Sequence, residues 1–251
     1  MYKSFLCTGA AFYFISIPIV ILFYQKSVAK TAELIAAGET VIYEAAFQFE
    51  GVLCAIDILI KQDGYWYAYE VKGSTSAKET FIQDAALQYF VITNSGLDLK
   101  DIFILHLNNK YVRYGELDLQ QLFTATSILN QVMALQDFIA EKIKELKNIL
   151  LLNDAPNISI GSHCSKPYDC NFYGYCSKGI EENNDDADYG KPIIEKEAVE
   201  EFIEQLTYPI CHIDFETWMT AVPEQDGHWS YRQIPFQFSV HKQKTDRKSV
   251  V

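Results

Sequence analysis

The sequence is short of positive charge. It has 21 lysines and arginines against 33 aspartates and glutamates, which gives a formal net charge of −12 at pH 7. A broad nucleic-acid-binding surface needs many Lys and Arg contacts to phosphates, so this balance argues against one but allows a narrow basic groove. The apolar fraction of 49% is that of a globular protein, and 251 residues can form one large domain or a domain with an added fragment.

Residues 4–24 lack any charged side chain and are just long enough to cross a bilayer as a helix. The stretch also lacks a small-x-small cleavage signal at its end, which argues against a removed signal peptide. Two interpretations are open: a single-pass membrane anchor, or an atypical buried start of a cytoplasmic protein. Residues 27–38, which end in Gly38, are expected to form a short helix.

Residues 43–72 contain three runs rich in β-branched, aliphatic and aromatic side chains. Glu50-Gly51 and Asp63-Gly64 separate the runs. An acid followed by glycine between two such runs is the usual signal for a two-residue hairpin turn. The stretch therefore predicts a three-stranded antiparallel meander.

The two turns predict a row of carboxylates across this meander. They place Glu44 opposite Asp57, and Asp57 opposite Glu70, with Lys72 on the same face as Glu70. Like charges at opposed positions destabilise a strand pair unless something neutralises them. Two or three carboxylates suit a hard divalent cation such as Mg²⁺ or Mn²⁺, so we expect a metal site here.

The alternative is that these acids are solvated positions on an exposed face of the sheet. Strict alternation places apolar neighbours on the face of Asp57, which is unusual for an open surface. Cys54 is expected on the opposite face, in the core. The expected apolar neighbours are Leu53, Ala55 and Leu59.

These acids are part of a pattern that resembles a known family. An acid on one strand, Glu-x-Lys on the next strand and Gln-Tyr on the following helix resemble the PD-(D/E)XK nuclease superfamily, in particular its RecB-like branch. The resemblance covers about residues 30–180. The residues that carry it are Asp57, Glu70-Val71-Lys72, Asp84 and Gln88-Tyr89.

The resemblance implies an α/β core, made of the antiparallel meander and flanking helices, that hydrolyses DNA, with RNA as the alternative substrate. It implies that Asp57 and Glu70 bind Mg²⁺ or Mn²⁺ and that Lys72 orients or activates the attacking water. Glu44 corresponds to an additional upstream acid, and the Val71 carbonyl to a further ligand. On the helix, the residues that would position the substrate are Gln88 and Tyr89.

The rest of this region predicts further regular elements. Residues 77–93 are expected to form a helix, and residues 101–107 a buried strand. Residues 111–117 are a candidate hairpin partner for that strand. The apolar pattern of residues 118–152 predicts one long helix across the sheet.

Three cysteines, Cys164, Cys170 and Cys176, are separated by five residues each time. In a chain without a clear secretory signal, such spacing favours metal binding over disulfides, although plain reduced cysteines are also an option. Zinc or an iron-sulfur cluster needs a fourth ligand. Iron-sulfur members of the RecB-like nucleases are similar, which implies a [4Fe-4S] cluster with Cys7 as that ligand. The candidates for the fourth ligand are Cys7, His163 and Cys54.

The carboxy-terminal part resembles a second domain type. CHIDFETW followed by IPFQFSVH is similar to a domain of unknown function found behind RecB-like nucleases, and to the first motif of RNase H-like, DnaQ-type exonucleases. In that motif an Asp-x-Glu pair binds a metal, and Asp214 and Glu216 share one face of the expected strand. Because such a site needs further strands and acids and the sequence stops at Val251, we expect a partial RNase H-like segment.

The sequence thus predicts four parts: a hydrophobic segment (1–28), a RecB-like nuclease domain with the cysteines (29–180), an acidic linker (181–192) and the start of an RNase H-like domain (193–251). The expected function is metal-dependent hydrolysis of DNA. The alternative is a catalytically inactive nucleic-acid-binding or scaffold protein with a nuclease fold, tethered to a membrane through residues 4–24.

Overall fold

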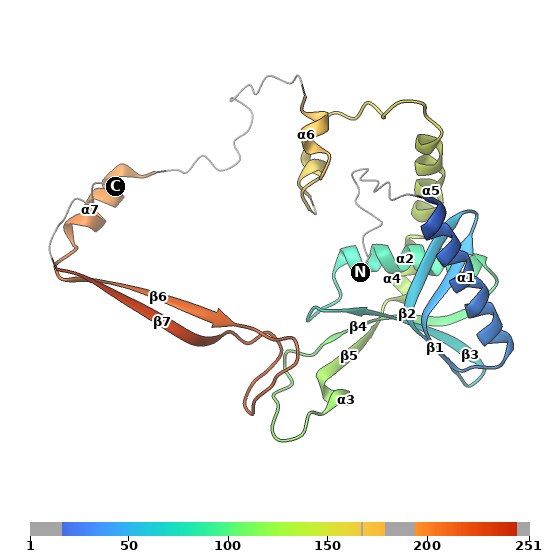
Figure 1. Cartoon of the computed structure of the whole chain (residues 1–251), viewed down its shortest axis with the longest axis horizontal. Helices are drawn as coiled ribbons and strands as arrows, with labels where there is room; N and C mark the ends of the chain where they lie inside the picture. The colour runs from blue at the N-terminus through green and yellow to red at the C-terminus, as the bar shows by residue number, and fades with distance from the viewer. Residues whose placement is uncertain (1–16, 167, 179–193, 245–251) are drawn as a thin grey trace.

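The computed structural model describes residues 17–166, 168–178 and 194–244. A mixed five-stranded sheet, in the order β1-β2-β3-β4-β5, is flanked by helices, and a separate two-stranded sheet, β6-β7, follows (Figure 1). The architecture is therefore α/β.

The predicted meander is confirmed. It consists of β1 (Val41–Phe49), β2 (Val52–Gln62) and β3 (Tyr65–Lys72), which pair antiparallel. Both residues of each turn have positive φ, as the tight hairpin turn requires. Tyr43 pairs with Ile58 and Ala45 with Ile56, so Glu44 and Asp57 occupy facing positions as the turns predict.

The alternation of buried residues changes phase at these facing positions. In β1 the buried residues Ile42 and Ala45 are three positions apart, and so are Ile56 and Leu59 in β2. Glu44, between the first pair, has a φ of 51°, which is the left-handed region. On either side of Glu44 and of Asp57, residues of opposite parity are therefore the buried ones.

The phase change corrects one expectation about this face, and the expected burial of Cys54 is confirmed. Leu59 lies on the other side of the phase change from Leu53 and Ala55, so strict alternation no longer places the three residues together. Cys54 is buried, and its thiol donates to the Gln88 carbonyl of the next helix at 3.9 Å. In β1 the break in alternation coincides with the left-handed conformation of Glu44.

Helix α2 (Glu79–Asn94) crosses from β3 to β4 (Leu99–Leu107), which lies parallel to β3. A parallel pair requires such a crossover connection. The helix packs on the sheet through buried small and β-branched side chains, and it brings its polar residues Asp84 and Gln88 over the carboxyl-terminal end of β3. The buried apolar residues of α2 are Ala85, Ala86, Val91 and Ile92.

The expected single helix over residues 118–152 is wrong. The segment forms α3 (Leu119–Leu122), strand β5 (Phe123–Ser127), α4 (Leu129–Ala134) and α5 (Gln136–Leu150). Strand β5 pairs antiparallel with β4, so it takes the place expected for residues 111–117. Threonine-rich FTATS suits a strand at the edge of a sheet.

Helix α1 (Ile17–Ala36) is longer than the helix expected over residues 27–38, and it packs on β1. The Thr31 hydroxyl accepts the Ala46 N–H at 2.9 Å. Within the described part of the chain, no helix has both the length and the apolar character needed to cross a membrane. Most of the uncharged stretch 4–24 lies outside the described residues.

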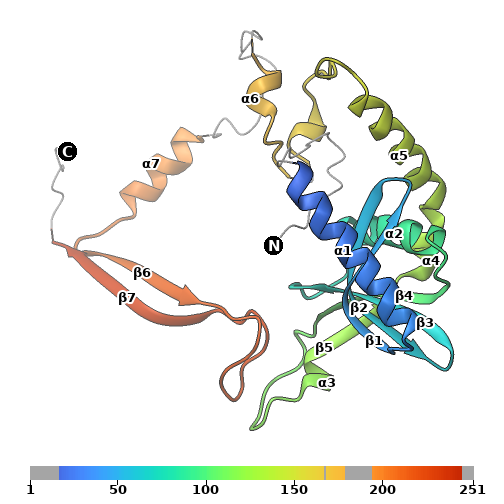
Figure 2. The same ribbon diagram turned by 45° about the vertical axis from the view of Figure 1, so that its right-hand side comes forward.

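The carboxy-terminal elements are the 3-10 helix η1 (Ser162–Cys164), α6 (Tyr173–Cys176), α7 (Lys196–Glu204), β6 (Ile210–Trp218) and β7 (Ile234–Gln243). The acidic linker 181–192 lies outside the described residues. The β6-β7 hairpin extends away from the larger sheet, and the loop that joins its strands turns back towards it (Figure 2).

Candidate active site

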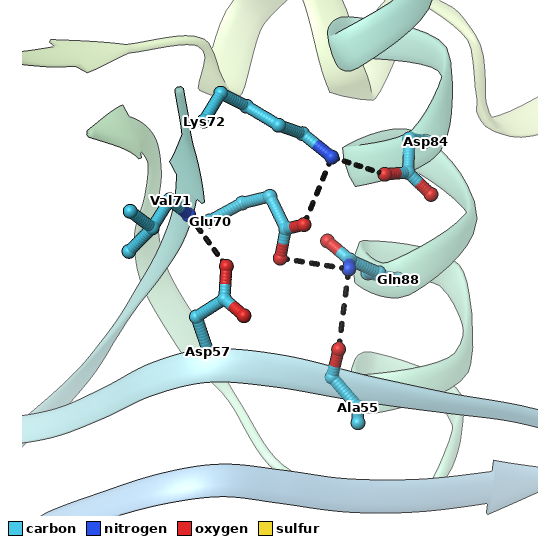
Figure 3. A network of polar contacts seen from close by, with 7 residues as sticks. All are labelled: Ala55, Asp57, Glu70, Val71, Lys72, Asp84 and Gln88. Atoms are coloured by element: carbon cyan, nitrogen blue, oxygen red, sulfur yellow. Dashed lines mark hydrogen bonds and ion pairs between the residues drawn. The ribbon is translucent and has the colours of Figure 1, made fainter. Parts of the chain in front are cut away.

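A polar cluster lies between β2, β3 and α2 (Figure 3). Its centre is Glu70, which is completely buried near the end of β3. Lys72 Nζ donates to Glu70 Oε1 at 3.0 Å, and Gln88 Nε2 donates to Glu70 Oε2 at 3.0 Å. A buried carboxylate is costly unless it is paired and hydrogen-bonded, and here each oxygen has a donor.

Asp57 lies beside Glu70 and Lys72 because the pairing between β2 and β3 ends just before it. The β2-β3 pairing begins at Ile58 and Tyr69. One residue beyond it, Asp57 Oδ2 accepts the Val71 N–H at 2.6 Å. The side chain therefore takes a main-chain donor that lies between Glu70 and Lys72. Figure 3 shows the Asp57 and Glu70 carboxylates on the same side of the strand.

Lys72 connects two carboxylates from different elements. Its Nζ contacts Glu70 at 3.0 Å and Asp84 Oδ2 of α2 at 2.7 Å. Burial alone would lower the pKa of Lys72, but the charges of Asp84 and Glu70 and the hydrogen bonds to them outweigh burial and raise it. The side chain is therefore a cation at neutral pH.

Gln88 points inward, towards Glu70. It is buried, and its Nε2 also donates to the Ala55 carbonyl at 3.3 Å. Its Oε1 is buried and has no hydrogen-bond partner among the described residues. The amide thus holds Glu70 in place, whereas the sequence interpretation assigned it to the substrate. Tyr89, next to it, packs partly buried against the apolar core.

The contact between Asp84 and Lys72 was not predicted, although the sequence contains a signal for it. Asp84 and Gln88 are four residues apart on a helix, so they lie on one face. That face is directed at Lys72 and Glu70. If this helix face is placed over the Glu-x-Lys strand, the spacing of Asp84 and Gln88 predicts that they contact Lys72 and Glu70.

Glu44 stands outside this cluster. It is exposed, and it lines a cavity of about 340 Å³ between α1 and β1 together with Lys26, Lys30 and Tyr43. No group of three or more His, Cys, Asp or Glu side chains suited to a metal ion is found in the described ranges. The expected row of three converging carboxylates thus reduces to Asp57 and Glu70.

The donor chemistry of these two residues fits a hard divalent cation. Mg²⁺ is commonly held by one or two carboxylates, with water and substrate oxygens completing its shell. A carboxylate offers about four lone-pair positions, so a carboxylate that accepts hydrogen bonds, as Glu70 does from Lys72 and Gln88, can also bind an ion. The unpartnered Gln88 Oε1 adds a neutral oxygen beside the carboxylates.

The cysteines do not form a comparable group. Cys164, Cys170 and Cys176 are free thiols, each partly buried, and the Cys170 N–H donates to the Cys164 carbonyl at 2.7 Å. Cys7 lies outside the described residues. Cys54 lies in the core between β2 and α2, where burial raises the pKa of its thiol to about 12 and its Sγ contacts the Gln88 carbonyl.

Asp214 and Glu216 lie on exposed strand β6, two positions apart. Asp214 pairs with Ser239 and Glu216 with Gln237, so the facing strand β7 brings neutral side chains beside the acids. The predicted second pair of acids is therefore on one face of the hairpin, without a third acid opposite it on β7.

Comparison with known proteins gives three findings. A family model described as "Domain of unknown function (DUF2779)" matches residues 211–250. No curated protein matches the chain. Among solved structures, one described as "Crystal structure of SSO0001" is similar at 12% identity, with a TM-score of 0.24, over 53% of this chain and 62% of that chain. The matched region is thus less than two thirds of that protein, and at this TM-score the likeness carries no argument.

Proposed function

We propose that this protein is a metal-dependent nuclease that hydrolyses DNA phosphodiester bonds at Asp57, Glu70 and Lys72. The observation that supports the proposal is the buried Glu70 carboxylate, which Lys72 and Gln88 hold beside Asp57. A buried carboxylate and cation at the end of a strand have a large desolvation cost, and such arrangements are common at functional sites.

Asp57 and Glu70 would hold a Mg²⁺ or Mn²⁺ ion. When bound, the ion would polarise a phosphoryl oxygen and lower the pKa of its bound water. The hydrogen bond from Val71 to Asp57 and the one from Gln88 to Glu70 orient the two carboxylates before any substrate arrives.

Lys72 acts as a donor in this scheme. Because Asp84 and Glu70 keep it charged, it does not take a proton from water at neutral pH. Its ammonium instead orients the attacking water and stabilises negative charge that develops on the phosphate. This role agrees with the Glu-x-Lys resemblance.

The cavity beside Glu44 offers the nucleic acid two lysines, of which Lys30 also contacts Glu33 at 3.3 Å. Lys26 and Lys30 are one helical turn apart on α1 and line this cavity with Tyr43. Two lysines and an exposed aromatic ring can contact neighbouring phosphates and a base. Such a groove is compatible with the net charge of −12.

The competing function is nucleic-acid binding without turnover. The exposed position of Glu44 favours it, since one of three expected acids is not gathered with the others. The two functions differ in a cleavage assay, because only the nuclease consumes its substrate.

The test is cleavage of end-labelled single-stranded DNA, double-stranded DNA and RNA by the full chain, with Mg²⁺ or Mn²⁺ titrated. We expect Asp57→Asn to reduce cleavage by at least about 100-fold, which is the effect of removing one strong charge interaction in a transition state. Asp137→Asn, at an exposed aspartate in the first turn of α5, is the matched control and should leave the rate unchanged. Equal cleavage by Asp57→Asn and wild type would reject the proposal, and binding without cleavage by wild type would favour the competing function.

A further inference from the structure

The loop between β6 and β7, residues 219–233, folds back onto the end of the five-stranded sheet. We call it the brace loop. In Figures 1 and 2 it lies beside the loop of residues 108–118. The Arg113 N–H donates to the His228 carbonyl at 2.9 Å, and the Gly227 N–H donates to the Arg113 carbonyl at 2.8 Å. The two loops are thus joined through both main-chain groups of one residue.

Side chains extend this contact. The Arg113 guanidinium donates to the carbonyls of Pro223 at 3.1 Å and Glu224 at 3.0 Å. Asp226 Oδ1 accepts the Gly115 N–H at 2.7 Å. Hydrogen bonds that involve charged groups are the stronger ones, so these contacts fix the brace loop in one register.

A small apolar cluster lies under the same contact. Leu107, Tyr111 and Leu122 are buried there, and Ala221 and Tyr231 of the brace loop pack against them. The contact therefore combines an apolar centre with main-chain hydrogen bonds, as a stable interface does.

Tyr231 reaches from the brace loop to the turn that follows the candidate site. Its hydroxyl donates to the Gly73 carbonyl at 2.8 Å. Its φ is 62°, an uncommon conformation for a residue with a side chain, and its N–H is bonded to the Thr220 carbonyl at 2.8 Å. The neighbouring Ser230 is buried. The surrounding loop thus holds Tyr231 in a conformation that costs free energy, which points to a specific role.

Gly73 directly follows Lys72, and the turn is fixed on its other sides. The Ser74 N–H donates to the Lys72 carbonyl at 2.8 Å, and the Leu107 N–H donates to the Ser74 carbonyl at 2.8 Å. With the bond from Tyr231, the main chain after Lys72 is held from β4 and from the brace loop.

We infer that the brace loop is a positioning element of the candidate active site, and that Tyr231 positions Lys72 through the main chain of Gly73. The catalytic part of this inference rests on the proposed nuclease function. It gives a role to a loop inside the segment that the DUF2779 model matches, and that role does not require Asp214 or Glu216 to bind a metal.

Tyr231→Phe in the full chain tests the inference, because it removes only the hydroxyl. Tyr173→Phe, which changes an exposed tyrosine of α6, is the matched control. Amide hydrogen exchange in the absence of nucleic acid follows the N–H groups of Ser74 and Leu107. We expect these to exchange about three- to tenfold faster in Tyr231→Phe, as the loss of one hydrogen bond allows, and to be unchanged in the control.

The second readout is the cleavage rate. We expect Tyr231→Phe to lower kcat several-fold while KM for DNA and the half-saturating Mg²⁺ concentration stay the same, because Tyr231 touches neither substrate nor ion. If the Ser74 and Leu107 N–H groups exchange at the wild-type rate in Tyr231→Phe, the brace loop does not hold the turn after Lys72. If they exchange faster but kcat is unchanged, the brace loop has no positioning role in catalysis. A wild-type protein that does not cleave any substrate would contradict the proposed function, while the exchange result would still decide whether the brace exists.

Discussion

At the scale of single residues, the site depends on a buried acid whose charge is balanced from two elements. Glu70 is fully buried and is paired with Lys72, whose side chain is 12% exposed. Removal of one partner from such a pair leaves the other charge uncompensated. We expect Lys72→Met to lower the free energy of unfolding by about 3 kcal/mol, measured by urea denaturation at pH 7 without metal. A loss below the error of that measurement would show that the pair does not compensate the charge of Glu70.

The raised pKa of Lys72 makes a prediction about alkaline pH. A group whose folded pKa lies above its unfolded value, here 10.5, stabilises the protein below that value. The contribution is lost as the pH rises through the folded pKa. Lys72→Arg keeps its charge over this range, so its unfolding free energy should fall less steeply above about pH 10 than that of wild type. Parallel urea-denaturation curves for the two proteins would contradict this assignment.

Gln88 offers a test of the Glu70 environment. Gln88→Glu places a second carboxylate against Glu70, and like charges at this distance repel each other. We expect it to lower both the free energy of unfolding and the cleavage rate more than Gln88→Leu, which removes the same donor without adding a charge. Equal losses in the two variants, by urea denaturation and by the cleavage assay, would show that residue 88 does not lie against the Glu70 carboxylate.

At the scale of elements, the sequence predicts which residues of the meander pair with each other, but it does not predict which of them are buried on either side of Glu44 and Asp57. Glu50-Gly51 and Asp63-Gly64 determine the turns locally, and the turns determine which residues face each other. The left-handed conformation of Glu44 has no such local signal, since glutamate rarely adopts it.

Glu44→Gly separates the structural role of this residue from a metal-binding role. Glycine adopts positive φ without a steric cost, so we expect stability equal to or above that of wild type in thermal unfolding. If Asp57 and Glu70 suffice for the ion, Mg²⁺-dependent cleavage should also persist. Loss of cleavage in a stable Glu44→Gly protein would restore Glu44 as a ligand.

The misassigned segment 118–152 shows the limit of periodicity. Its apolar spacing suits a helix over most of its length, and α4 and α5 do form. Residues 123–127 become a strand because the edge of β4 offers hydrogen bonds to them. His106 Nε2 also contacts the Thr126 hydroxyl at 3.0 Å across that pair. Such long-range pairing is invisible in a local window of sequence.

At the scale of the whole molecule, the charge must be considered locally. On the proposed function, a chain of net charge −12 needs local cations to attract DNA, and Lys26 and Lys30 in the cavity beside Glu44 are the candidates. We expect the double variant Lys26→Glu, Lys30→Glu to bind single-stranded DNA more weakly and with a salt dependence lower by about 1.4 in log-log slope, at about 0.7 per lost contact. Fluorescence anisotropy across a salt series measures both. The double variant Lys144→Glu, Lys147→Glu on α5, with the same change in net charge, is the control, and an equal effect there would assign the loss to net charge alone.

The contact between Tyr231 and Gly73 joins residues 158 positions apart along the chain. During synthesis, the Glu-x-Lys strand therefore leaves the ribosome long before the tyrosine that secures its end. Domains begin to fold while translation continues. If the protein is the proposed nuclease, a nascent chain would pass through a stage in which Glu70 and Lys72 are in place but the end of β3 is not yet held, and the later hairpin would complete the candidate site.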